Sequence, residues 1–151
     1  MVLTRRYKDL GTDLKGLYKD IKKELQQDKD LSIISETHGS INDVPFNSII
    51  AARASVPRFI TGTLREVSVT ITGVPDDWLL EVHTGIWFGN MVLPSAGGFL
   101  IAGPVGAVAG AGTTMVFARE YGRKLKNRIK ELVKKRSDKA YSEEKVETFI
   151  D

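Results

Sequence analysis

Hydrophobic residues recur every three or four positions over the first 25 residues. The repeating positions are Leu3, Tyr7, Leu10, Leu14, Leu17 and Ile21, with Tyr18 and Leu25 beside them. This period is typical of one face of an α-helix, so the pattern predicts an amphipathic helix of about six turns over residues 3–25. Gly11 and Gly16 each lower its intrinsic stability by about 1 kcal/mol relative to alanine, which indicates that the helix packs against another element.

From residue 31 the pattern changes to short runs rich in β-branched and aromatic residues. The runs occupy residues 31–37, 46–54, about 64–72, and 78–84. Turn residues separate them, with a loop expected at residues 39–45 and a hairpin turn at 73–77. The sequence therefore predicts four strands.

The last two runs alternate apolar and polar positions. The apolar positions are Val67, Val69 and Ile71 in one run and Trp78, Leu80 and Val82 in the other. Because successive side chains of a strand point to opposite faces, one face of this hairpin is apolar and the other is polar. Such alternation predicts an antiparallel sheet that is covered on one side.

No charged residue occurs over the 37 positions from 82 to 118, which hold eight of the fourteen glycines. So long an apolar run must be buried by the protein itself, by a second copy of the chain or by a membrane. The segment predicts a Gly-rich helix with a break near Gly103-Pro104. Small residues four positions apart would line one side of it and allow another backbone to approach closely. They are Gly98, Ala102, Gly106, Gly110 and Thr114.

Three partners stay open for this small-residue stripe: the protein's own sheet or first helix, another copy of the chain, and lipid. A helix that spans a bilayer needs roughly 20 apolar residues. Pro94 and Pro104 interrupt the apolar run, so membrane insertion would take the form of a re-entrant hairpin.

A second helix, rich in basic residues, is predicted from about residue 118 to residue 136 or 137. Residues 119–139 hold ten Lys or Arg against Glu120, Glu131 and Asp138, a local balance of +7 within a chain of net charge +3. The side chains expected to contact anions are Arg123, Lys124, Lys126, Arg128, Lys130, Lys134 and Lys135. Three interpretations stay open, namely a solvated helix face, contact with lipid headgroups, and nucleic-acid binding.

The order of the elements predicts the α+β class, with a four-stranded antiparallel sheet that carries both helices on its apolar face. Residues 1–137 form a single expected domain that includes the Gly-rich apolar segment 85–118. Residues 138–151 are expected to be a polar tail, in which Val146, Phe149 and Ile150 could dock.

The sequence offers little catalytic chemistry. Zero cysteines exclude disulfides, thiolate nucleophiles and Cys-ligated zinc. Of the two histidines, His83 shares a strand face with Glu81, a weak acid–base pair that more simply decorates an exposed face. Arg53, Arg58 and Arg65 could gather into an anion site if their strands pair. We expect no enzyme activity, cofactor or metal.

The leading hypothesis is a non-enzymatic protein that self-associates, or associates with an anionic membrane, through the apolar segment and the basic helix. An alternative is a soluble domain that encloses an apolar small molecule or lipid. The residues that could line such a pocket are Trp78, Trp87, Phe88, Phe99 and Phe117. A second alternative is nucleic-acid binding. Without an apolar core of the kind a secretory signal needs near residue 1, we expect a location in the cytoplasm or on the cytoplasmic side of a membrane.

Overall fold

The computed structural model describes residues 2–29, 31–53, 66–84, 91–95, 98–102 and 115–150; for residues 53, 91–95, 98–102 and 115–120 it describes the backbone only. The elements run in the order β1 (Val2–Lys8), α1 (Leu14–Gln27), β2 (Leu31–Ile41), β3 (Val44–Arg53), β4 (Glu66–Val74), β5 (Asp77–Thr84), β6 (Met91–Ser95), β7 (Gly98–Ala102), α2 (Met115–Arg136), a 3-10 turn (Glu143–Lys145) and β8 (Val146–Ile150).

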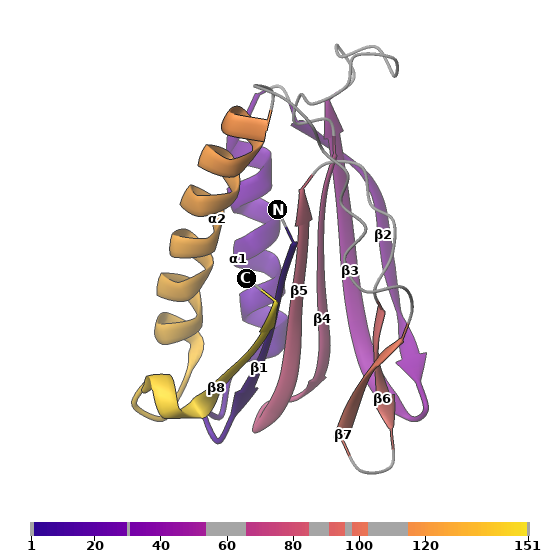
Figure 1. The fold of residues 1–151 in the computed structure, drawn as a ribbon, viewed down its shortest axis with the longest axis vertical. Helices are drawn as coiled ribbons and strands as arrows, with labels where there is room; N and C mark the ends of the chain where they lie inside the picture. Colours follow the sequence, from indigo (N-terminus) through magenta and orange to yellow (C-terminus); the bar gives the residue numbers. More distant parts are fainter. Residues whose placement is uncertain are drawn as a thin grey trace.

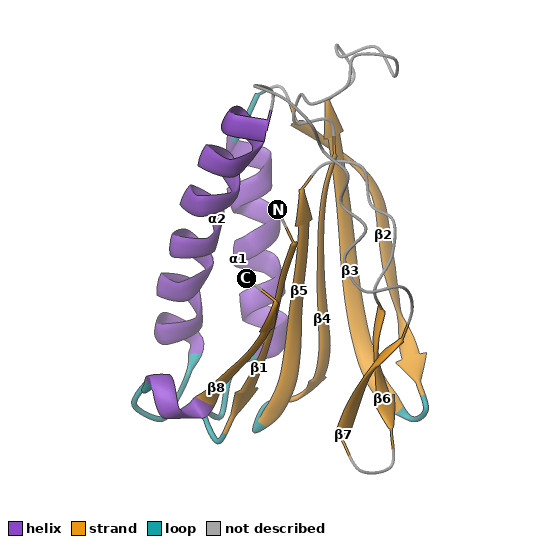
Figure 2. Cartoon of the chain, in the orientation of Figure 1, coloured by secondary structure: helices purple, strands orange, loops and turns teal. Residues whose placement is uncertain are grey.

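The described strands form a six-stranded sheet in the order β2-β3-β4-β5-β1-β8, in which all neighbours are antiparallel. Helices α1 and α2 lie side by side on one face of it (Figures 1 and 2). Strands β6 and β7 pair with each other in a separate two-stranded sheet. The α+β class is confirmed, but the prediction of four strands is wrong because β1 and β8 extend the sheet at one side.

The predicted helix over residues 3–25 is in fact a strand followed by a shorter helix. Leu3 and Tyr7 lie four positions apart, and a spacing of four places two residues on one face of a strand as well as of a helix. Both side chains are buried in β1. The chain then turns through Asp9 and Gly11, whose φ angles are +53° and +56°. Asp13 caps α1 by accepting a bond from the Gly16 N–H at 3.0 Å.

The four predicted strands correspond to β2, β3, β4 and β5. The expected loop at 39–45 is instead a tight turn at Asn42 and Asp43, both of which have positive φ. Two such residues form the turn that matches the twist of a hairpin, so β2 and β3 are longer than expected. Strand β2 consequently extends over eleven residues.

The core lies between the sheet and the two helices. Val69 pairs with Val82 and Ile71 with Leu80, which confirms the predicted apolar face of the hairpin. The helices contribute Leu17, Ile21 and Leu25 from α1 and Leu125, Ile129, Leu132 and Val133 from α2. Trp78 stacks on Tyr7 with ring centroids 4.4 Å apart, and both side chains are fully buried.

Strand β8 belongs to the segment that the sequence suggested was a polar tail. It pairs with β1 through contacts such as Tyr7 with Val146 and Arg6 with Glu147. Tyr141 approaches the same corner, where the ammonium groups of Lys130 and Lys134 each lie 5.4 Å from its ring centroid. The pairing gives β1 a neighbour on both sides.

A buried hydroxyl joins three parts of the chain at one end of the sheet. The Trp78 indole N–H donates to Thr12 Oγ1 at 3.1 Å, and Thr12 Oγ1 lies 2.9 Å from Ser137 Oγ just after α2. The Thr12 backbone N–H donates to the Pro75 carbonyl at 3.0 Å. Thr12 thus ties the start of α1 to the β4–β5 turn and to the end of α2.

Backbone bonds reinforce the same junction. The Asp13 N–H donates to the Arg136 carbonyl at 2.8 Å, and the Asp9 N–H donates to the Asp76 carbonyl at 2.9 Å. Asp76 also accepts a bond from the Gly11 N–H. We call this region, made of residues 9–13, 75–77 and 136–139, the closed end.

We predict that Thr12→Val lowers the free energy of unfolding by about 1–3 kcal/mol, because the substitution leaves the buried Trp78 N–H without its acceptor. Urea unfolding followed by tryptophan fluorescence measures this change. Thr148→Val, on the exposed part of β8, is the matched control and should have little effect. Equal changes in the two variants would show that the Thr12 hydroxyl has no special part in stability.

Candidate interaction surface

The end of the sheet opposite the closed end is where the chain leaves the sheet for its longest connections. Register places Leu31 beside Arg53, Ala52 beside Glu66, and Val67 beside Thr84. The segments after β3 and after β5 therefore start at the same end. Helix α2 also begins there, since its last residues are bonded at the closed end (Figure 1). We call this region, made of residues 31, 53, 66 and 84 with residues 115–126 of α2, the open end.

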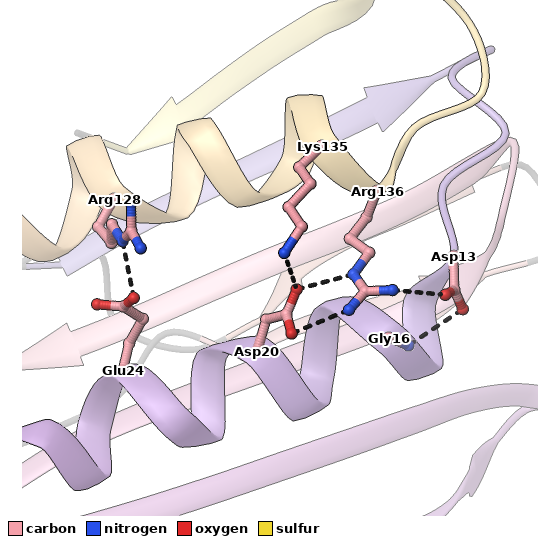
Figure 3. Close-up of polar contacts among 7 residues, drawn as sticks. All are labelled: Asp13, Gly16, Asp20, Glu24, Arg128, Lys135 and Arg136. Carbon is pink, nitrogen blue, oxygen red and sulfur yellow. Dashed lines mark hydrogen bonds and ion pairs between the residues drawn. The ribbon is translucent and has the colours of Figure 1, made fainter.

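The half of α2 near the closed end uses its basic residues to hold the protein together (Figure 3). Arg136 donates from Nε to Asp20 at 2.7 Å and from Nη2 to the other Asp20 oxygen at 3.0 Å. Lys135 Nζ lies 3.7 Å from Asp20, and Arg128 donates to Glu24 at 2.7 Å. These contacts join α2 to α1.

Asp20 is the centre of this interface. Its carboxylate is buried, and the hydrogen bonds from the Arg136 guanidinium lower the pKa of Asp20 below its usual value of 3.8, although burial acts in the opposite direction. An ionised carboxylate with a two-point guanidinium contact is the strong, geometrically specific kind of ion pair. The pair fixes the position of α2 along α1.

Several of the predicted anion-contacting residues form ion pairs within the chain. Besides Arg128 and Lys135, Lys130 pairs with Glu143 and Lys134 with Glu131. Arg123, Lys124 and Lys126 lie in the part of α2 nearest the open end. The side chains of Arg123 and Lys124 are exposed there.

The acidic partners on α1 were missed by the sequence analysis. Asp13, Asp20 and Glu24 are seven and four positions apart, which places them on one face of the helix. Arg128 and Arg136 are eight positions apart, which places them on one face of α2. Arg128 pairs with Glu24, and Arg136 pairs with Asp13 and Asp20. This complementarity was visible as a pattern, but only the antiparallel approach of the two helices showed that the stripes meet.

Glu81 and His83 share one face of β5, as predicted, but this face is not exposed at these positions. Leu80 and Val82 pack toward the helices, so Glu81 and His83 point to the opposite face. Their side chains are 10% and 8% exposed, and His83 Nε2 lies 3.5 Å from Glu81 Oε2.

Hydroxyl side chains flank Glu81 on the neighbouring strands. Thr4 of β1 and Thr70 of β4 are its cross-strand partners, and Thr70 Oγ1 lies 2.9 Å from Ser48 Oγ on β3. The result is a polar row across four strands. Within the described residues, no group of three His, Cys, Asp or Glu is placed to hold a metal ion.

The small-residue stripe is not helical where the structure describes it. Gly98 and Ala102 are the first and last residues of β7, paired with Ser95 and Met91. The helix predicted for these two positions is wrong, because the backbone of residues 98–102 pairs with residues 91–95 rather than forming local helical bonds. The other stripe positions, Gly106, Gly110 and Thr114, lie outside the described residues, and a part in self-association stays a prediction.

The residues proposed to line an apolar pocket are not gathered by the described structure. Trp78 belongs to the sheet–helix core. Trp87 and Phe88 lie outside the described residues, as do Arg58 and Arg65 of the suggested anion site and the side chain of Arg53. Phe99 belongs to β7 and Phe117 to α2, and their side chains are likewise outside the described part. The pocket therefore stays a prediction.

Comparison with known proteins finds no family model, curated protein or solved structure that matches this chain. Within the part of the chain that the structure describes, neither helix has the length and apolar character needed to cross a bilayer.

We predict that Asp20→Asn lowers the free energy of unfolding at neutral pH, because the buried acceptor of Arg136 loses its charge. The folded-state pKa of Asp20 is lowered, so the stabilisation is fully present above the unfolded value near 3.8 and is lost as the pH falls through the folded value. The difference between the wild type and the variant should therefore shrink below about pH 4.

Urea unfolding at a series of pH values measures this difference. Glu131→Gln is the control, because Glu131 and Lys134 form a pair on the exposed surface of a single helix and such pairs contribute little. A loss in Asp20→Asn that is the same at pH 7 and pH 3 would contradict an ionic origin.

Proposed function

We propose that this protein is a non-enzymatic membrane-surface protein that attaches to anionic lipid through its open end. The observation that carries the proposal is the presence of exposed basic side chains in the first half of α2. Arg128, Lys135 and Arg136 form ion pairs with α1 toward the closed end, and the side chains of Arg123 and Lys124 are exposed near the open end. Anionic lipid headgroups attract such basic residues by about 1 kcal/mol each.

The two flanks of the uncharged run from 82 to 118 support the same location. The run begins in the last residues of β5 and ends in the first turn of α2, and both of these lie at the open end (Figure 1). If its apolar residues contact lipid, the basic residues Arg119 and Arg123 follow at the depth of the headgroups, where Lys and Arg side chains are favoured. The segment and the helix would then bind the same surface.

The proposed attachment is peripheral. Residues 91–95 and 98–102 pair with each other, and Figure 1 shows this pair toward the closed end, away from the proposed contact. The exposed side chains of Arg123 and Lys124 suit the headgroup region at the surface of a bilayer, where anionic lipid attracts basic residues. The cytoplasmic leaflet is the anionic one, so we place the protein there.

The proposal assigns no catalysis. The ionic groups with the best geometry hold elements together, as Arg136 does with Asp20 and as Arg6 does in its two-point contact with Asp77 at 2.7 and 2.8 Å. The Glu81–His83 pair lies among cross-strand hydroxyl groups on β1, β3 and β4. We interpret this pair as part of the sheet's polar face.

We predict that the full-length protein floats with vesicles of equimolar phosphatidylcholine and phosphatidylserine and does not float with phosphatidylcholine alone. Arg123→Gln combined with Lys124→Gln should weaken binding about thirtyfold, since each lost charge costs about 1 kcal/mol. The matched control is Lys134→Gln combined with Lys135→Gln, which removes the same charge near the closed end and should change binding little. Binding that is absent, or that falls equally in both double variants, would reject attachment through the open end.

A further inference from the structure

Strand β2 is a long edge strand that is exposed. Among the described strands its one neighbour is β3, and each residue from 34 to 40 is exposed. The large apolar side chain of Ile34 is 60% exposed. Strands at the edge of a sheet present unpaired N–H and C=O groups, and proteins commonly protect them with charged side chains, proline, a bulge or a short strand length. Strand β2 is long, contains neither lysine nor proline, and has Glu36 as its one formally charged residue.

The other edge of the sheet is different. Strand β8 has five residues against eleven in β2, and it carries Glu147, which lies 3.6 Å from Lys8 on the neighbouring strand. A short, charged edge discourages a further strand. Strand β2 has one irregularity, a register shift between Ile33 and Ser35, and is regular from Ser35 to Ile41. Seven regular residues are enough for a strand pair.

The part of β2 that is regular is complementary to itself. When two copies pair antiparallel about a two-fold axis normal to the sheet, opposite residues share a face, so the axis must pass through a residue position. An axis at Glu36 would oppose two carboxylates, and one at His38 would oppose two imidazoles. An axis at Thr37 places Glu36 of each copy opposite His38 of the other, and this gives two favourable contacts at once.

Both side chains are already held at this edge by the same chain. Glu36 accepts bonds from Lys22 at 2.9 Å and from the Tyr18 hydroxyl at 2.7 Å. These bonds, the one from Lys22 first, lower the pKa of Glu36, so it is ionised at neutral pH. His38 Nδ1 lies 2.7 Å from Asn47 Oδ1, which leaves Nε2 as the ring nitrogen to meet a second carboxylate. Because these two side chains are already held in place, association costs little additional side-chain entropy.

We propose that two copies of this chain pair antiparallel through β2, centred on Thr37, and form one continuous sheet. The inference does not depend on the membrane proposal. The two-fold axis reverses the strand direction, so the open ends of the two copies point in opposite directions. If the proposed lipid contact also holds, the dimer joins two membrane surfaces rather than lying on one.

The chain has no cysteine, so a single introduced cysteine reports the register directly. In Thr37→Cys the two thiols lie opposite each other, with Cα atoms about 4.5–5.5 Å apart, within disulfide range. In Ser35→Cys each thiol lies opposite Gly39 of the other copy, and the two thiols are about 13 Å apart along the strands. Thr148→Cys places the thiol at the opposite edge.

Oxidation of each full-length variant without lipid should give a covalent dimer of twice 16.7 kDa for Thr37→Cys only. No covalent dimer from Thr37→Cys, or equal cross-linking of Ser35→Cys or Thr148→Cys, would overturn the proposed pairing. Because vesicles are absent, this outcome is separate from the flotation result.

A second variant tests the contact without cross-linking. Thr37→Lys opposes two ammonium groups at the axis and should raise the dimer dissociation constant at least about fivefold in sedimentation equilibrium. Thr148→Lys makes the same change at the β8 edge and should leave the constant as in the wild type, with both variants unfolding at the wild-type urea midpoint. A wild-type protein that stays monomeric at every concentration, or equal effects of the two lysines, would overturn the proposal.

Discussion

The architecture depends on one buried junction, where the Trp78 indole N–H donates to the Thr12 hydroxyl at the closed end. A strand pair, the start of α1 and the end of α2 meet there, although Thr12 is 66 positions from Trp78 and 125 positions from Ser137 along the chain. These buried polar groups are all hydrogen-bonded in the observed arrangement. If a helix shifted relative to the sheet, a donor would be left without an acceptor in apolar surroundings. The junction therefore fixes how the two helices lie on the sheet.

That arrangement decides where charge remains on the surface. With α1 and α2 antiparallel and fixed at one end, Asp20 meets Arg136 and Glu24 meets Arg128. The acidic residues of α1 thus pair with basic residues in the closed-end half of α2. The other half of α2 has the exposed side chains of Arg123 and Lys124 near the open end.

The two proposed surfaces lie in different places and rest on different forces. The open end combines cationic side chains with the flanks of an uncharged segment, a combination suited to an anionic interface. The β2 edge offers backbone hydrogen bonds and a self-complementary pair of side chains, a combination suited to a second copy of the chain. Neither surface requires the other, and both lie away from the hydrogen-bonded closed end.

The sequence by itself determined the β4–β5 hairpin, the α+β class and the basic character of α2. These follow from alternation and composition within a few residues, as in Val69 and Ile71 facing Val82 and Leu80. Tertiary structure decided whether Leu3 and Tyr7 belong to a strand or a helix, because a spacing of four suits both periods. It also decided the strand at Gly98–Ala102, the recruitment of β8 and the pairing of Asp20 with Arg136. Each of these depends on which distant segment lies opposite, and local periodicity carries no information about a partner that is far away in the chain.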